Sequence, residues 1–198
     1  GLQAPFVRRI GGVYYMFYGD WEHLCVATSE DGKSFTRRVG PDGKTGMFTE
    51  GTGNHARDAM LLTVGDTHYL YYTAYPGGRG GVYCRTSKDL RAWSNSHLVA
   101  FGGSAGTGPY AAECPFVVQH QPSGVFYLFR TQRYGENAQT SVYRSADPLN
   151  FGVEDDRFLV ARLPVAAPEI FEHEGQYYIA CLLPSLKGIR VARLGFHG

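Results

Sequence analysis

The feature that most constrains this chain is a short motif that occurs three times at a constant spacing. Each copy has Ser-x-Asp and then an aromatic residue four positions after the aspartate, as in TSEDGKSF, TSKDLRAW and RSADPLNF. The serines are Ser29, Ser87 and Ser145, so the two steps are equal (87 − 29 = 58 and 145 − 87 = 58). A fixed period of this length indicates one supersecondary unit that is repeated along the chain, each copy packing on its neighbour.

A second pattern surrounds this motif and occurs four times. A short apolar strand, a turn with glycine and an aromatic-rich strand are predicted over residues 4–19, 58–73, 114–130 and 167–181, and a third strand follows each time. A fourth strand is expected near the aromatic residue of the first three motifs. Each unit is therefore an antiparallel four-stranded meander of about 55 residues, which is typical of a β-propeller blade.

The predicted fold class is all-β, and the 14 tyrosines, 12 phenylalanines and 26 glycines suit short strands and tight turns. We expect a single propeller domain over residues 1–198, with blades at about 1–40, 56–100, 112–160 and 165–198. The last unit lacks its fourth strand. An open arc would expose apolar faces and strand edges, so we expect an incomplete domain whose missing blade lies upstream or on a partner chain.

The Ser-x-Asp motif has a structural interpretation. Serine and aspartate side chains accept hydrogen bonds from nearby backbone N–H groups, so the motif should hold the turn between the third and fourth strands. The aromatic residue that follows should pack between blades.

Composition excludes several other classes of function. The net charge is +1 and no run of lysine or arginine occurs, which argues against nucleic acid or an anionic membrane as a partner. No segment is apolar enough to span a bilayer and no signal peptide is visible, so the compartment stays undetermined. The four cysteines are far apart and are expected to be free thiols; no metal site and no cofactor are predicted.

The candidate site lies where the first strands of the blades begin. In a propeller these strands line the central channel, and two of the four starts carry a carboxylate, Asp58 and Glu113. Neither carboxylate is needed for folding, and buried carboxylates have the shifted pKa values that acid–base chemistry uses. We expect Arg57 to pair with Asp58 and keep it ionised. Glycine-rich links and second-turn loops at the same face should bind substrate through Asp20, Trp21, His55, Arg57, Tyr75 and Arg130, with Arg133 and Tyr134 as further contacts.

These motifs resemble those of known glycoside hydrolases. RDAM and AECPFV are similar to the Arg-Asp-Pro and Glu-Cys-Pro motifs of glycoside hydrolase family 32, and the whole chain resembles the five-bladed furanosidase propellers that include family 43. The resemblance implies that Glu113 is the general acid/base and that Asp58 stabilises the transition state. It also implies a third carboxylate on a first blade, which has no counterpart here. Ala59 replaces the usual proline, and Ala166 stands where some relatives carry histidine.

Four functional hypotheses remain open. The first is a hydrolase of furanosides (β-fructosides, or oligosaccharides of arabinose or xylose), acting by carboxylate acid/base catalysis on an oligo- or polysaccharide. The second is a non-catalytic or degenerate carbohydrate-binding propeller that lacks the third carboxylate. A scaffold for protein partners and a sialidase rank lower, because a scaffold needs no paired carboxylates and the arginine triad of a sialidase cannot be placed. An oligomer is expected if another chain completes the ring.

Overall fold

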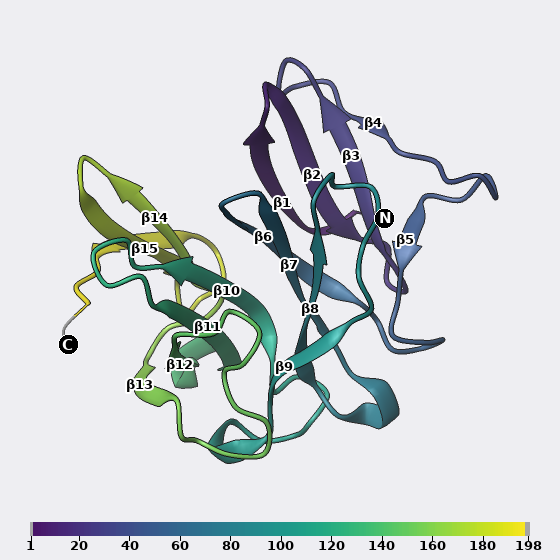
Figure 1. Cartoon of the computed structure of the whole chain (residues 1–198). Coiled ribbons are helices and arrows are strands. Elements are labelled where there is room, and N and C mark those ends of the chain that lie inside the picture. Colours follow the sequence, from purple (N-terminus) through teal and green to yellow (C-terminus); the bar gives the residue numbers. More distant parts are fainter. Residues whose placement is uncertain (1, 197–198) are drawn as a thin grey trace.

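The structure is a computed structural model that describes residues 2–196. It confirms the predicted fold class: the chain is a β-propeller with four blades, each an antiparallel sheet whose strands follow one another in sequence (Figure 1). Blade one contains β1 (Gln3–Ile10), β2 (Val13–Gly19), β3 (Leu24–Ser29) and β4 (Thr36–Arg37), with β5 (Gly46–Phe48) also paired to β3. Blade two contains β6 (Arg57–Val64), β7 (Thr67–Ala74), β8 (Gly81–Ser87) and β9 (His97–Phe101).

The last two blades follow the same order. Blade three contains β10 (Glu113–Gln119), β11 (Phe126–Arg133), β12 (Gln139–Ser145) and β13 (Leu159–Leu163). Blade four has three strands, β14 (Glu169–His173), β15 (Gln176–Leu182) and β16 (Ile189–Arg193). Short 3-10 turns lie in the loops at η1 (Pro76–Gly78), η2 (Gly103–Ala105) and η3 (Gly135–Asn137). No helix among residues 2–196 is long and apolar enough to cross a membrane.

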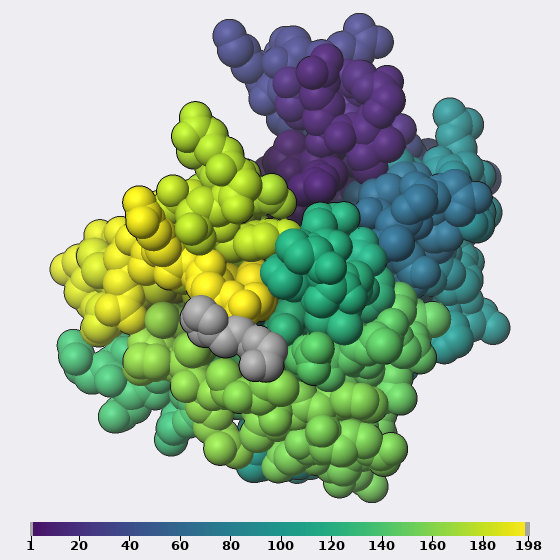
Figure 2. All heavy atoms as spheres, turned by 60° about the vertical axis from the view of Figure 1, so that its left-hand side comes forward, coloured from purple at the N-terminus to yellow at the C-terminus, as the bar shows by residue number. Residues whose placement is uncertain are grey.

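The hydrophobic core lies between the blades. Phe17 packs with Leu61 and Leu70 where blades one and two meet, and further clusters join blade two to three and blade three to four. Figure 2 shows the blades following one another around the molecule, from purple through blue and green to yellow. Burial of apolar surface between consecutive sheets therefore holds the arc together.

The repeated motif has the role that the sequence predicts. In blade one, the Ser29 hydroxyl accepts a hydrogen bond from the Gly32 N–H (2.9 Å), and Asp31 accepts from the backbone of Lys33 and Ser34 (2.8 Å each). The equivalent turns after β8 and β12 are held in the same way. Phe151 is fully buried and packs in the core between blades two and three. The motif thus stabilises the turn that follows the third strand of each of these blades.

The four first strands begin with the same irregularity. One residue near each start has a positive φ: Ala4 (42°), Asp58 (56°), Cys114 (46°) and Ala167 (48°). In the first three blades the pairing with the second strand also shifts at this point, as in a β-bulge. Positive φ is uncommon outside glycine, so its repetition shows that the fold requires this bend. The residues at the bend, among them Asp58 and Cys114, line the channel where the candidate site lies.

Candidate active site

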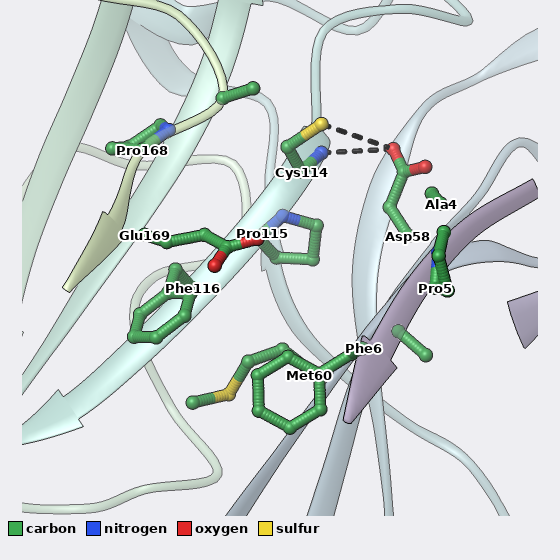
Figure 3. A pocket seen from close by; sticks show the side chains of 12 residues that line it. Ala4, Pro5, Phe6, Asp58, Met60, Cys114, Pro115, Phe116, Pro168 and Glu169 are labelled. Carbon is green, nitrogen blue, oxygen red and sulfur yellow. Dashed lines mark hydrogen bonds between the residues drawn. The ribbon is translucent and has the colours of Figure 1, made fainter. Parts of the chain in front are cut away.

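A pocket of about 100 Å³ lies where the four first strands meet (Figure 3). Each blade contributes three consecutive residues to its lining: Ala4, Pro5 and Phe6; Asp58, Ala59 and Met60; Cys114, Pro115 and Phe116; Ala167, Pro168 and Glu169. The first strands therefore line the central channel, as predicted. Most of these side chains are apolar, so the few polar groups that reach the channel stand out.

Asp58 is the most enclosed of these polar groups. Its side chain is 9% exposed, and its Oδ2 accepts a hydrogen bond from the Cys114 N–H (2.9 Å) and contacts the Cys114 thiol (3.7 Å), as Figure 3 shows. Burial raises the pKa of Asp58, although the Cys114 N–H and the charge of Arg57 act in the opposite direction. The backbone bend at Asp58 and its backbone donor together hold this carboxyl group in the channel.

Arg57 pairs with Glu113 more closely than with its neighbour in sequence. One guanidinium NH2 lies 2.8 Å from Glu113 Oε1, whereas Arg57 Nε lies 3.9 Å from Asp58 Oδ2. The charge of Arg57 lowers the pKa of Asp58, as expected, but burial has the larger effect, and the closer partner of Arg57 is Glu113. The reason is the register of the strands: Arg57 and Glu113 are the first residues of β6 and β10, and Asp58 is equivalent to Cys114.

An aromatic stack lies beside this ion pair. The His55 ring stacks on Tyr75, with 4.9 Å between ring centroids, and the Arg57 guanidinium lies 5.0 Å from the Tyr75 centroid. Arg57 also donates to the His55 carbonyl (3.2 Å). Cation–π and stacking contacts therefore fix the arginine that holds Glu113. The structure thus brings four predicted site residues, His55, Arg57, Tyr75 and Glu113, into one cluster.

Arg130 is not placed to bind a substrate. Its side chain is buried, with the residue 1% exposed, and its guanidinium donates to the carbonyls of Ala111 (2.8 Å), Gly102 (3.2 Å) and Gly106 (3.0 Å). The predicted role in binding sugar hydroxyls is therefore wrong, because these donors are already used. Arg130 instead fixes the link that leads into β10.

Asp20 also has a local role. Its Oδ1 accepts hydrogen bonds from the N–H groups of Glu22 (3.0 Å) and His23 (2.7 Å), which closes the turn between β2 and β3. Although partial burial works against it, these backbone donors lower the pKa of Asp20. Asp20 is therefore a turn residue, and the prediction that it binds hydroxyls has no support in its contacts.

Three further predicted residues differ in their surroundings. Trp21 is 57% exposed and is free to meet a ligand. Tyr134 is partly buried, and its hydroxyl lies 3.3 Å from Cys114 Sγ, so it contacts the thiol that touches Asp58. The Arg133 side chain contacts Gln139 and is exposed. Of these, Tyr134 is connected to the channel carboxyl group and Trp21 is available at the surface.

Two residues, one that lines the channel and one in the link that leads into β10, were not found from the sequence. Glu169 lines the channel from blade four, and Figure 3 shows its side chain extending toward Pro115. Tyr110 is 64% exposed in the link that runs into β10. Glu169 could have been found by aligning the blades, because it stands at the position that Phe6, Met60 and Phe116 occupy. No group of three or more His, Cys, Asp or Glu side chains among residues 2–196 is arranged to hold a metal ion.

Comparisons with known proteins identify the fold. No protein-family model matches the chain, and no curated protein is significantly similar to it. Among solved structures, a thermostable family-43 glycoside hydrolase is 18% identical with a TM-score of 0.74, covering 99% of this chain and 72% of that chain. The chain has the fold of the propeller glycoside hydrolases.

Two other solved structures of this fold are an endo-arabinase and a β-fructofuranosidase. An endo-arabinase from Bacteroides thetaiotaomicron is 16% identical with a TM-score of 0.73, covering 98% of this chain and 74% of that chain. A family-32 β-fructofuranosidase from Bombyx mori is 18% identical with a TM-score of 0.66, covering 91% of this chain and 42% of that chain. At these identities the likeness concerns the propeller fold.

Proposed function

We propose that this chain forms part of a glycoside hydrolase that acts on furanoside-type glycosides, namely β-fructosides or oligosaccharides of arabinose or xylose. The observation that carries the proposal is a pair of carboxyl groups in contrasting surroundings, with Asp58 in the channel lining and Glu113 at the start of β10 next to Cys114. Glu113 faces the Arg57 guanidinium at 2.8 Å, whereas Asp58 is buried on a backbone N–H with a raised pKa. Carboxyl groups in different environments are typical of acid–base sites.

The proposed chemistry assigns one role to each group. Glu113 is the general acid/base that protonates the glycosidic oxygen, and Asp58 holds the sugar and stabilises the developing oxocarbenium ion. Because Arg57 contacts Glu113 in the free protein, a sugar hydroxyl that binds Arg57 would release Glu113 for proton transfer. In this proposal, the sugar would also contact Glu169, Trp21, Tyr75 and His55.

A charge-removing substitution tests the catalytic assignment. We expect Glu113→Gln to abolish hydrolysis of an activated aryl furanoside or a β-fructoside by the natural protein. Glu50→Gln is the matched control, because Glu50 also pairs with an arginine (Arg85, 2.9 Å) and is similarly enclosed, but it lies outside the channel. Unchanged turnover in Glu113→Gln, or equal loss in both variants, would show that Glu113 is not the catalytic acid.

A non-catalytic carbohydrate-binding propeller is the second candidate. It is favoured by the direct Arg57–Glu113 contact, which ties up the proposed acid in the free protein. Binding of arabino-, xylo- or fructo-oligosaccharides without release of reducing sugar, in the wild type and in Glu113→Gln alike, would support this candidate over the hydrolase.

We also propose that another sheet covers the free side of blade four. Phe171 (44% exposed), Ile189 (68%) and Val191 (54%) lie on the same face of β14–β16, opposite the face that packs on blade three. Every other blade buries its corresponding face against the next one, so an apolar sheet face of this kind calls for a partner. Light scattering of the natural protein, compared with Val191→Lys, will show whether a second chain supplies it.

A further inference from the structure

The link between β9 and β10 is held far more firmly than a glycine-rich loop requires. It covers residues 102–112, and the buried guanidinium of Arg130 donates to its carbonyls at Gly102, Gly106 and Ala111. No carboxylate pairs with Arg130 in the described chain, so three carbonyl oxygens satisfy a buried cation. Burying a charge in this way is costly, and its structural effect is to fix the path of the link.

Blade two fixes the same link from the other side. The Gly80 N–H donates to the carbonyls of Thr107 (3.2 Å) and Gly108 (3.1 Å), and the Thr73 hydroxyl donates to the Ala112 carbonyl. A Cβ atom at Gly80 would lie 2.6 Å from the Gly108 oxygen and 2.8 Å from the Pro109 oxygen. The close approach of two backbones therefore depends on glycine at position 80.

The tip of this fixed link carries an exposed aromatic side chain. Ala111 N–H donates to the Gly108 carbonyl (3.0 Å), which forms a tight turn with Pro109 and Tyr110 at its centre. Tyr110 is 64% exposed, and it does not line the channel pocket. It stands three residues before Glu113, and Pro109 accepts from the same Arg57 that pairs with Glu113. A large ring is thus held outside the pocket, close to the proposed acid.

We propose that Tyr110 is the stacking residue of a second sugar subsite, which binds the leaving-group sugar on the outer side of Glu113. This inference rests on the proposed function, because Glu113 would separate the sugar held in the channel from the sugar that leaves. In this arrangement, one ring binds in the channel pocket beside Asp58, and a longer substrate continues outward past Glu113. A rigid link lowers the entropy lost when a ring stacks on Tyr110.

Binding of a saccharide series tests the proposal. The wild-type protein is titrated calorimetrically with mono-, di- and trisaccharides of arabinose, xylose and fructose, and the same series is repeated with three variants. Tyr110→Ala removes the ring, Gly80→Ala displaces the link by steric clash, and Gly108→Ala is the control. A Cβ atom at Gly108 meets nothing within 4 Å, so this control changes the same link without moving it.

We expect Tyr110→Ala and Gly80→Ala each to weaken binding of di- and trisaccharides about fivefold to tenfold, with monosaccharide affinity unchanged. Gly108→Ala should bind like the wild type. An unchanged disaccharide affinity in Tyr110→Ala, or an equal loss for monosaccharide, would overturn the inference, as would a wild type that binds no saccharide. Because the readout is binding, a protein that binds but does not cleave refutes the hydrolase and leaves the subsite intact.

Discussion

The ion pair between Arg57 and Glu113 supports a quantitative prediction. Their side chains are 5% and 17% exposed, and the two atoms lie 2.8 Å apart. Removing one partner of a buried pair typically costs about 3–5 kcal/mol. Since water still reaches Glu113, we expect Arg57→Met to lower the free energy of unfolding by about 3 kcal/mol, at the low end of that range. Glu113→Gln keeps an oxygen that can accept from Arg57, so it should cost about 1–2 kcal/mol.

The assay is a double-mutant cycle followed by urea unfolding at pH 7. The double variant leaves neither charge unpaired, so we expect a coupling free energy of about 2 kcal/mol between the two sites. With a slope of about 2 kcal/mol per molar urea, Arg57→Met alone moves the midpoint by about 1.5 M. The cycle is repeated with Asp58→Asn as background, because Arg57 also lies near Asp58. Additive effects in both backgrounds would show that the pair contributes nothing specific to this fold.

Three further predictions concern stability. Burial raises the pKa of Asp58, so the ionised carboxylate destabilises the fold at high pH; Asp58→Asn should raise the urea midpoint at pH 8 and leave it unchanged at pH 3. The backbone N–H groups of Ser34 and Lys33 lower the pKa of Asp31 to about 2, so the stability lost in Asp31→Asn at pH 7 should disappear as the pH falls from about 4 to 2. Phe151→Ala should cost about 3–5 kcal/mol, because the ring is fully buried between blades, and calorimetry should show a melting temperature lower by about 6–20 °C.

The fold could be predicted because the same pattern of strands and turns occurs four times in the sequence. The Ser-x-Asp spacing and the alternating aromatic strands are local signals, and local hydrogen bonds satisfy them in the structure. The same alignment of blades predicted Asp58 and Glu113 at the channel mouth, since strand starts meet near the axis of a propeller; the structure has Asp58 in the channel lining and Glu113 paired with Arg57. Because each blade is built from strands that are consecutive in sequence, the local repeat was enough to predict the arrangement of the strands.

The contacts of individual side chains could not be predicted in this way. Arg130 looks like a substrate ligand in sequence, because a loop arginine near aromatic residues suits sugar binding. Its partners are the carbonyl groups of Ala111, Gly106 and Gly102, which lie 19, 24 and 28 positions earlier in the chain. No sequence pattern predicts these contacts. The sequence suggests that Arg57 pairs with its neighbour Asp58, yet its closer partner is Glu113, 56 positions away on the next blade. Bulges and fixed loops are set by tertiary packing, which a linear alignment does not contain.

The shared bend at the strand starts has a consequence for how such a channel can change. All four blades hold one residue at nearly the same left-handed φ, and aspartate and asparagine tolerate that conformation better than alanine does. Asp58 and Cys114 use this geometry for polar contacts, whereas Ala4 and Ala167 leave it empty. The propeller therefore has four equivalent backbone positions around one axis, and their φ is one that aspartate adopts readily. A single substitution, Ala4→Asp or Ala167→Asp, would add another carboxyl group to the channel lining, so the number of acidic groups in the channel can change by one residue at a time.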